Sequence, residues 1–237
     1  MLTPKLVLPA PIKTIFVLPI VLLIIGESGI AVKDPKGFSR RSSAHKPLRV
    51  FDSGLSDCYN FAMLTTRRVL DSLKQIGVTH VVGLPDNSTA ALFHALADDP
   101  DVYLITVTRE GEAFATAAGL WIGGQKPLVL IQNTGFLESG DALRGTLVRM
   151  RIPVVCLVSY RGYKSLTNPL PATLTPDVLS RRDMDSVATL LEPTLRAWAI
   201  SYEIVSDNSE LERIVAAEQR AQQEMFPTAV VIAETIR

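Results

Sequence analysis

The sequence predicts a single α/β domain over residues 63–237, built on one parallel sheet with helices on both faces. Two observations lead to this prediction. From Met63 onward, short apolar runs alternate with helix-type segments, which is the pattern of buried parallel strands and their crossover helices. The composition, with 47% hydrophobic residues, also allows one sizeable core.

The individual elements follow from apolar spacing and chain breakers. The first helix presents Val69, Leu70, Leu73 and Ile76 on one face and ends at Gly77, a typical C-terminal glycine. Strands are predicted over Val78–Gly83, Val102–Val107, Pro127–Gln132, Pro153–Val158, Ala197–Ile204 and Thr228–Ile232. Further helices are predicted from the N-cap candidates Asp86–Ser88 to Ala97, and over Glu110–Ile122, Asp141–Met150, Ser186–Leu191 and Glu210–Glu224. The connections include a loop, Asn133–Ser139, and a long irregular stretch, Ser159–Asp183, whose length favours a functional or partner-contacting segment.

Residues 1–62 are predicted to form an irregular extension outside the domain. The extension holds an eleven-residue apolar run, Ile15–Ile25, which is too short for a comfortable membrane span. Residues 33–60 read as a linker rich in Pro, Gly, Ser and Arg. Three interpretations stay open: a secretion signal, a single membrane anchor, or translated sequence ahead of a start at Met63. Membrane contact is expected only if the apolar run is a real anchor, and the expected location is otherwise cytoplasmic.

Charge and motif content argue against several function classes. The chain carries 24 basic and 24 acidic residues, so it lacks the positive surface of a nucleic-acid binder. The sequence contains no dinucleotide fingerprint, no P-loop and no nucleophile elbow. Its two cysteines and three histidines have no ligand spacing, so we expect no metal site built by this chain alone.

One carboxylate stands at the carboxyl end of a predicted strand. Glu110 follows Val102–Val107 and opens a helix rich in small residues that continues past Gly119. Open α/β sheets place their ligand chemistry at this edge, and a carboxyl group among apolar neighbours acquires an unusual protonation preference. The alternative is that Glu110 only caps its helix, where a carboxylate suits the helix dipole. Glu112 is the rival carboxylate and is more typical of a surface position in the first turn.

Four motifs occur in order along the chain. They are Gly83-Leu84-Pro85-Asp86, Thr108-Arg109-Glu110 with Ala118-Gly119, Gln132-Asn133-Thr134-Gly135, and Ser159-Tyr160-Arg161-Gly162. Together they resemble the pyrimidine-binding domain of thiamine-diphosphate-dependent 2-oxo-acid decarboxylases, in particular the sulfopyruvate decarboxylase α subunit and the phosphonopyruvate decarboxylases. The resemblance covers residues 63–237 and implies a flavodoxin-like sheet. It also implies a carboxy-lyase subunit that uses thiamine diphosphate to decarboxylate a small anionic 2-oxo acid such as sulfopyruvate or phosphonopyruvate.

The resemblance implies cofactor roles for two motifs. Glu110 would share a proton with N1′ of the cofactor's aminopyrimidine, which promotes loss of the thiazolium C2 proton. Gln132, Asn133 and Gly135 would line the cofactor cleft. The protein would supply one carboxyl group and a dry cleft, while the cofactor carries the chemistry.

Substrate contacts are expected from the other two motifs. Asp86, Asn87 and Ser88 follow the first strand, where related enzymes place substrate-facing residues, although helix capping explains them equally well. Arg161 is expected to contact the substrate anion or a subunit interface, because a guanidinium fork suits carboxylate, sulfonate and phosphonate groups. The simpler alternative is a surface arginine beside a loop.

The chain departs from the family pattern in two places. Leu137 and Glu138 stand where the family has a Gly-Asn pair, so a bulkier, charged loop leaves the substrate open. The Gly-Asp-Gly…Asn motif that holds the diphosphate through Mg²⁺ is missing, since Ser139-Gly140-Asp141 is followed by Ala142. We therefore expect the Mg²⁺ ligands on a diphosphate-binding, β-type partner subunit, and no activity from this chain alone. The stoichiometry stays open.

Two other functions stay open. The chain could belong to a carboligase of the acetolactate-synthase type, which joins an acyl carbanion to a second carbonyl. It could also be a flavodoxin-like binding or regulatory subunit that has lost the chemistry, which the altered Leu137-Glu138 loop favours slightly.

Overall fold

The computed structural model describes residues 14–16, 63–166 and 173–237. Its strands are β1 (Thr14–Phe16), β2 (His80–Gly83), β3 (Tyr103–Thr106), β4 (Pro127–Gln132), β5 (Val155–Ser159), β6 (Tyr202–Val205) and β7 (Thr228–Ile232). Its α-helices are α2 (Thr66–Gln75), α3 (Ala90–Asp98), α4 (Glu110–Ile122), α5 (Asn133–Glu138), α6 (Gly140–Leu143), α7 (Pro176–Leu179), α8 (Ser186–Ala197) and α9 (Glu212–Glu224). Shorter turns are the π-helical η1 (Arg144–Val148) and the 3₁₀ turns η2 (Tyr163–Ser165) and η3 (Asn208–Glu210).

The strands form one sheet in the order β1-β3-β2-β4-β5-β7-β6, and every neighbouring pair is parallel. The prediction of a single parallel sheet is therefore confirmed. The edge strand β1 belongs to the extension that was expected to lie outside the domain. It pairs with β3, with Thr14 opposite Leu104, so the extension supplies one edge of the sheet.

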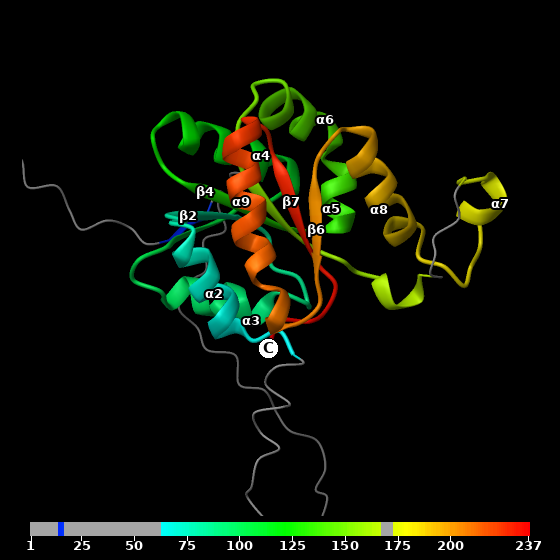
Figure 1. Ribbon diagram of the computed structural model, residues 1–237, viewed down its shortest axis with the longest axis horizontal. Helices are drawn as coiled ribbons and strands as arrows, with labels where there is room; N and C mark the ends of the chain where they lie inside the picture. The colour runs from blue at the N-terminus through cyan, green and yellow to red at the C-terminus, as the bar shows by residue number, and fades with distance from the viewer. Residues whose placement is uncertain (1–13, 17–62, 167–172) are drawn as a thin grey trace, which may run out of the picture.

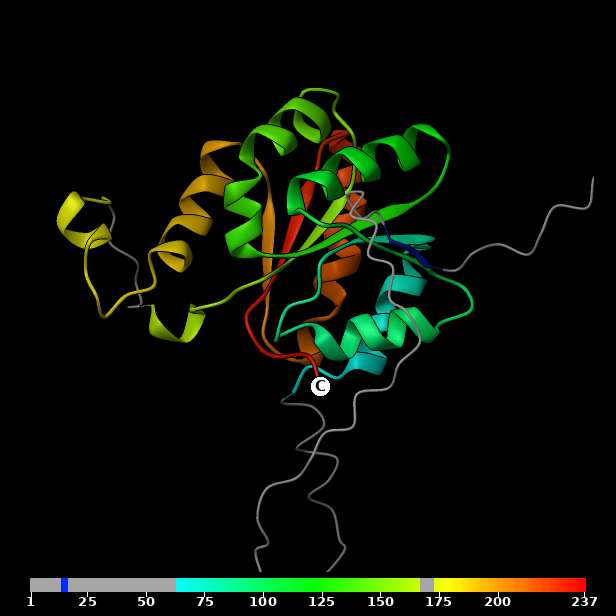
Figure 2. The same ribbon diagram turned by 180° about the vertical axis from the view of Figure 1, so that it is seen from behind.

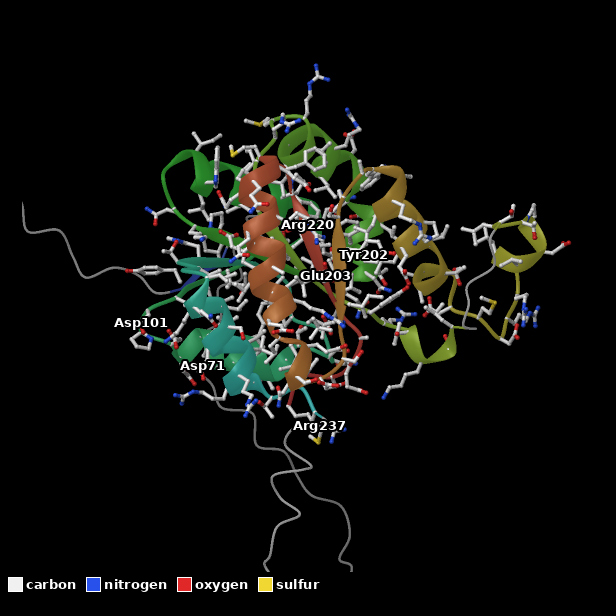
Figure 3. The ribbon with its side chains drawn as sticks, viewed as in Figure 1. Asp71, Asp101, Tyr202, Glu203, Arg220 and Arg237 are labelled. Carbon is white, nitrogen blue, oxygen red and sulfur yellow. The ribbon has the colours of Figure 1, made fainter. Side chains whose placement is uncertain are left out.

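Helices cover both faces of the sheet, as Figures 1 and 2 show from opposite sides. One face packs against α2, α3 and α9, and the other against α4, α5, α6 and α8. Alternation along the strands builds both cores: in β4, Leu128 and Leu130 join the first cluster, whereas Val129 and Ile131 join the second. On the first face, Arg220 of α9 forms an ion pair with Glu203 of β6 at 3.2 Å, and both are labelled in Figure 3.

The prediction of a loop over Asn133–Ser139 is wrong, because Asn133–Glu138 forms α5. Leu137 and Glu138 are better helix formers than the Gly-Asn pair expected from the family pattern. Phe136 is fully buried and contacts the rings of Phe114 and Trp198, which anchors the helix to its neighbours.

Strands β2, β3 and β5 and helix α9 differ from their predicted ranges by one or two residues at an end. Three further differences concern helices α3, α6 and α8. The N-cap of α3 is Thr89, because Asp86 closes a turn ahead of the helix rather than capping it. Helix α8 continues through Pro193 to Ala197, since Leu195 extends its buried face, and β6 consequently begins later than expected. The helix predicted over Asp141–Met150 is divided into α6 and the π-helical η1.

The start and the end of the domain lie together, as the C-terminal mark in Figure 1 indicates. The amide of Arg237 donates to the carbonyl of Leu64 at 2.9 Å, and the amide of Thr66 donates to the carbonyl of Arg237 at 2.6 Å. Within the described residues, no helix has the length and apolar character needed to cross a membrane. Residues 17–62, with most of the apolar run, the linker and Cys58, lie outside the described part.

Candidate active site

The predicted site residues follow strands at the carboxyl edge of the sheet. The chain passes from β2 through α3 to β3 on one side, and then through α4 to β4 on the other side of β2. The topology therefore reverses between β2 and β4, and parallel α/β sheets bind ligands in the crevice at such a reversal.

Glu110, the first residue of α4, lies over α5 at this edge. A Cβ atom placed on Gly135 would lie 2.2 Å from Cγ of Glu110 and 2.3 Å from its Cδ and Oε1. Only a glycine at position 135 therefore leaves room for the Glu110 carboxyl group in this place. The side chain is half-buried, and its carboxyl group accepts no hydrogen bond from the described residues.

The carboxylate of the rival residue, Glu112, is hydrogen-bonded at the start of its own helix. It is exposed and accepts hydrogen bonds from the amide of Thr108 at 3.0 Å and from the Thr108 hydroxyl at 3.0 and 3.2 Å. These bonds lower the pKa of Glu112 from its usual value, the amide contributing most. The hydrogen bonds at the start of α4 thus belong to Glu112, which leaves the carboxyl group of Glu110 available.

Glu138, at the end of α5, pairs with Arg109. Its Oε1 accepts hydrogen bonds from both Nε, at 3.1 Å, and Nη2 of Arg109. Its Oε2 accepts one from the Ser139 hydroxyl at 3.1 Å. The pairing holds the pKa of Arg109 above its usual range, and Arg109 with Ser139 holds the pKa of Glu138 below its usual range.

Asn133 and Arg161 are brought together by a hydrogen bond between the β4 and β5 strand ends. Asn133 is fully buried, and its Nδ2 donates to the carbonyl of Arg161 at 2.9 Å. Its Oδ1 accepts no hydrogen bond from the described residues. Gln132, half-buried, precedes it at the end of β4, opposite Ser159 of β5. The exposed guanidinium of Arg161 lies with its Nε 3.5 Å from Oδ2 of Asp185.

The carboxylate of Asp86 ties two loops together. It accepts hydrogen bonds from the Ser88 amide at 2.6 Å, from the Thr89 hydroxyl at 3.0 Å and from the Ser159 hydroxyl at 2.7 Å. Ser159 is fully buried, and β4 lies between its strand and β2. Asp86 thus fixes the loop after β2 to the end of β5, while Asn87 on the same loop is exposed.

Ser88 and Arg161 share a hollow of about 250 Å³, which is also lined by Tyr163 and Lys164. Glu110 does not line this hollow, so the two halves of the predicted site are separate within this chain. A larger groove, of about 730 Å³, lies between α2 and α9. Asp71 and Glu203, labelled in Figure 3, line that groove, but none of the predicted site residues does.

The described residues give little support to a metal site or to a nucleophilic cysteine. They contain no group of three or more His, Cys, Asp or Glu side chains that could hold a metal ion. Cys156 is buried in the core, and burial raises the pKa of its thiol to about 12, so it is no nucleophile at neutral pH.

The sequence did not reveal the partners that hold the site residues. Asp185 was missed, although an aspartate ahead of an apolar helical pattern is an N-cap signal. Ser159 was named within a motif, but its bond to Asp86 joins residues 73 positions apart. The pairing of Glu138 with Arg109 likewise depends on α5, which was predicted as a loop.

Comparison with known proteins decides the family. Residues 63–181, half of the chain, match the model of "Thiamine pyrophosphate enzyme, N-terminal TPP binding domain". The chain belongs to this family. The cofactor of the family is thiamine pyrophosphate, also called thiamine diphosphate, and the sequence-based resemblance is confirmed.

The chain is also similar in sequence to several curated proteins. The chain is 31% identical over 147 residues to "Sulfopyruvate decarboxylase subunit alpha" of Methanococcus maripaludis, covering 61% of this chain and 83% of that protein. It is 33% identical over 127 residues to "Phosphonopyruvate decarboxylase" of Streptomyces viridochromogenes, covering 52% of this chain and 32% of that protein. The chain thus spans about a third of the length of this phosphonopyruvate decarboxylase.

A solved structure supports the fold. Benzoylformate decarboxylase from Polynucleobacter necessarius superposes with a TM-score of 0.52 at 17% identity, covering 72% of this chain and 30% of that one. At this identity the likeness shows the fold of a thiamine pyrophosphate enzyme domain and no more.

Proposed function

We propose that this chain is the pyrimidine-domain, α-type subunit of a heteromeric thiamine-diphosphate-dependent decarboxylase. Its substrate would be a small anionic 2-oxo acid such as sulfopyruvate or phosphonopyruvate, the classes named for the relatives above. The observation that carries the proposal is the carboxyl group of Glu110. It lies over Gly135 at the topological reversal, without a hydrogen bond from the described residues.

The residues present fit the cofactor. Glu110 offers an uncommitted, half-buried carboxyl group that can share a proton with N1′ of the aminopyrimidine. Gly135 keeps space for that carboxyl group, and Gln132 and Asn133 precede it in the chain, at the end of β4 and the start of α5. The unpaired, buried Oδ1 of Asn133 is a further polar atom at this edge. When bound, thiamine diphosphate supplies the electron sink for decarboxylation.

Arg161 and Ser88 are the substrate contacts that the geometry supports best, because they line one hollow at the same edge of the sheet. The guanidinium of Arg161 can bind a carboxylate, sulfonate or phosphonate group. Asn87 lies exposed on the loop that Asp86 holds in place. We propose that Asp86 acts mainly by holding this loop, since its carboxylate already accepts three hydrogen bonds.

A β-type partner would complete the site. The sequence lacks the Gly-Asp-Gly motif, and three of the matched relatives are named as α subunits. The partner would carry the Gly-Asp-Gly…Asn motif, the Mg²⁺ ligands and the opposite wall of the cleft. On its own, the chain should therefore show no decarboxylase activity.

The decisive experiment replaces Glu110 in the assembled enzyme. Glu110→Gln, co-expressed with the partner, should lower decarboxylation and thiazolium C2 proton exchange about 100- to 10,000-fold, the usual contribution of a proton-transferring group. Assembly should be unaffected, as size-exclusion chromatography would report. Glu112→Gln is the matched control, because it removes a carboxylate of the same helix turn, and it should keep near-normal turnover. Normal turnover of Glu110→Gln would end the proposal.

A carboligase remains the second candidate, since one matched relative is a synthase by name. The chain is 35% identical over 75 residues to "2-succinyl-5-enolpyruvyl-6-hydroxy-3-cyclohexene-1-carboxylate synthase" of Renibacterium salmoninarum. Product analysis with and without an aldehyde acceptor separates the two. A new carbon–carbon bond formed at the expense of the released aldehyde would favour carboligation.

A further inference from the structure

Helix α5 contacts the start of α4 at two neighbouring points. Gly135 lies under the carboxyl group of Glu110, and Glu138, one turn later on α5, pairs with Arg109. Residues three apart share a helix face, so one face of α5 meets two consecutive residues of the strand-to-helix turn. Arg109, the residue directly before Glu110, is therefore neutralised by Glu138. The family pattern has an uncharged asparagine at the position of Glu138.

The two arginines of the site differ in how firmly they are held. Arg109 donates two hydrogen bonds to one oxygen of Glu138, whose other oxygen is fixed by Ser139. Arg161 has a single, longer contact of 3.5 Å with Asp185. Asp185 in turn uses its Oδ1 to accept from the amides of α8. The guanidinium of Arg161 is thus the freer of the two.

We propose that Glu138 is a specificity-determining residue that sets where the anionic group of the substrate binds. By occupying Arg109, it withholds a guanidinium from the space beside Glu110, so that the anionic group binds at Arg161 instead. The other cation of that hollow, Lys164, is paired with Glu234 at 2.8 Å, which leaves Arg161 as the available one. The inference rests on the proposed function for its meaning in catalysis. The pairing itself is a property of this chain and can be tested without the partner.

The first test measures anion binding to the isolated full-length chain. Inorganic sulfate is titrated while the Nε–Hε signal of Arg109 is followed by nuclear magnetic resonance, with Arg109→Gln used to assign the signal. Glu138→Gln should lower the apparent dissociation constant for sulfate at Arg109 by about fivefold, the change that loss of one exposed ion pair can give. The double variant Arg109→Gln with Glu138→Gln has no Arg109 signal, so its sulfate affinity is compared with that of Glu138→Gln by isothermal titration calorimetry and should show no such gain.

A matched control separates the pairing from the change in net charge. Asp141→Asn also removes one carboxylate from an exposed arginine pair, that of Asp141 with Arg144 at 2.6 Å, and should leave sulfate binding at Arg109 unchanged. An equal gain in sulfate affinity in Asp141→Asn and Glu138→Gln would overturn the inference. A gain in sulfate affinity that persists in the double variant without Arg109 would overturn it as well.

The second test uses the assembled enzyme and compares a 2-oxo acid that carries a sulfonate or phosphonate with pyruvate. For the substrate that carries the sulfonate or phosphonate, Glu138→Gln should lower KM and kcat together about fivefold, because its anionic group then also binds unproductively at Arg109. Both values for pyruvate should change little. Equal changes in KM for both substrates would overturn the specificity role. If the assembly decarboxylates neither substrate, the proposed function fails, whereas the sulfate titration still decides the Arg109 pairing.

Discussion

The first turn of a helix leaves backbone amides without a partner, and helices α4 and α8 differ in how an acidic residue stands at this turn. At α8, the side chain of Asp185 accepts hydrogen bonds from the amides of Val187 and Ala188 at 3.0 and 3.3 Å, which satisfies part of the open first turn. At α4, no side chain of the described residues caps the helix, and the carboxyl group of Glu110 in the first turn accepts no hydrogen bond from them. The comparison separates an acidic residue used for stability from one kept available for a ligand.

The largest effect should come from Gly135→Ala. The added methyl group would lie 2.2 Å from Cγ of Glu110, and the flexible glutamate would swing away because the three atoms nearest to the methyl group all belong to its side chain. We expect at least about 100-fold lower activity of the assembled enzyme, because a displacement of about 1 Å in a catalytic group can cost that much. Steady-state decarboxylation of the co-expressed complex measures it.

The free energy of unfolding of Gly135→Ala should not fall, in contrast to its activity. Alanine is favoured over glycine within a helix by up to about 1 kcal/mol, so urea unfolding should show no loss. Gly119→Ala, where nothing lies within 4 Å of the added methyl group, shares this gain without touching Glu110. Wild-type turnover in Gly135→Ala would show that Glu110 does not act from the position described here.

An intermediate effect is expected for Asp185→Ala. Loss of the cap should lower the free energy of unfolding by about 1 kcal/mol, the typical cost of removing an N-cap side chain. Asp185→Asn is the matched control, since asparagine caps about as well but cannot form an ion pair with Arg161. Equal destabilisation by both variants would assign the effect to charge and contradict the capping role.

The smallest effect is expected for Glu112→Gln, and it should depend on pH. The bonds from Thr108 place the folded pKa of Glu112 below its ordinary value of 4.5. The stabilisation is therefore complete above that ordinary value and is lost as the pH falls through the lowered folded pKa. Melting temperatures of variant and wild type should differ slightly at pH 7 and converge in acid. A difference that grows on acidification would contradict this assignment.

The sequence predicted elements best where chain breakers border them. The bounds of α4, β4 and β7 agree with prediction to the residue, because Gly123-Gly124 ends α4 and Pro127 begins β4. Helix α5 was missed because its six residues are too few to show a helical apolar period, and because Gly135 lowers their helix propensity. The position of Glu110 at a strand end was predictable from local sequence, since the strand and the helix beside it are both local patterns.

The contacts around Glu110 were not predictable in the same way. Its placement over Gly135 depends on how α4 packs against α5, and the bond between Asp86 and Ser159 joins loops across β4. Such contacts depend on the tertiary arrangement, and no single segment of sequence contains them. Local patterns and the family resemblance therefore identified the candidate residues, and the fold identified what holds each of them.

The backbone bonds that join Leu64, Thr66 and Arg237 have a consequence for gene fusion. Because the start of the described domain at Leu64 lies beside its end at Arg237, a second domain joined to Arg237 would leave the surface next to the place where residues 63–237 begin. In a chain shortened to residues 63–237, a domain joined to either end would therefore start from nearly the same place. A single-chain enzyme could then be tried in either order of its halves, with the linker length and the loss of β1 as the two variables.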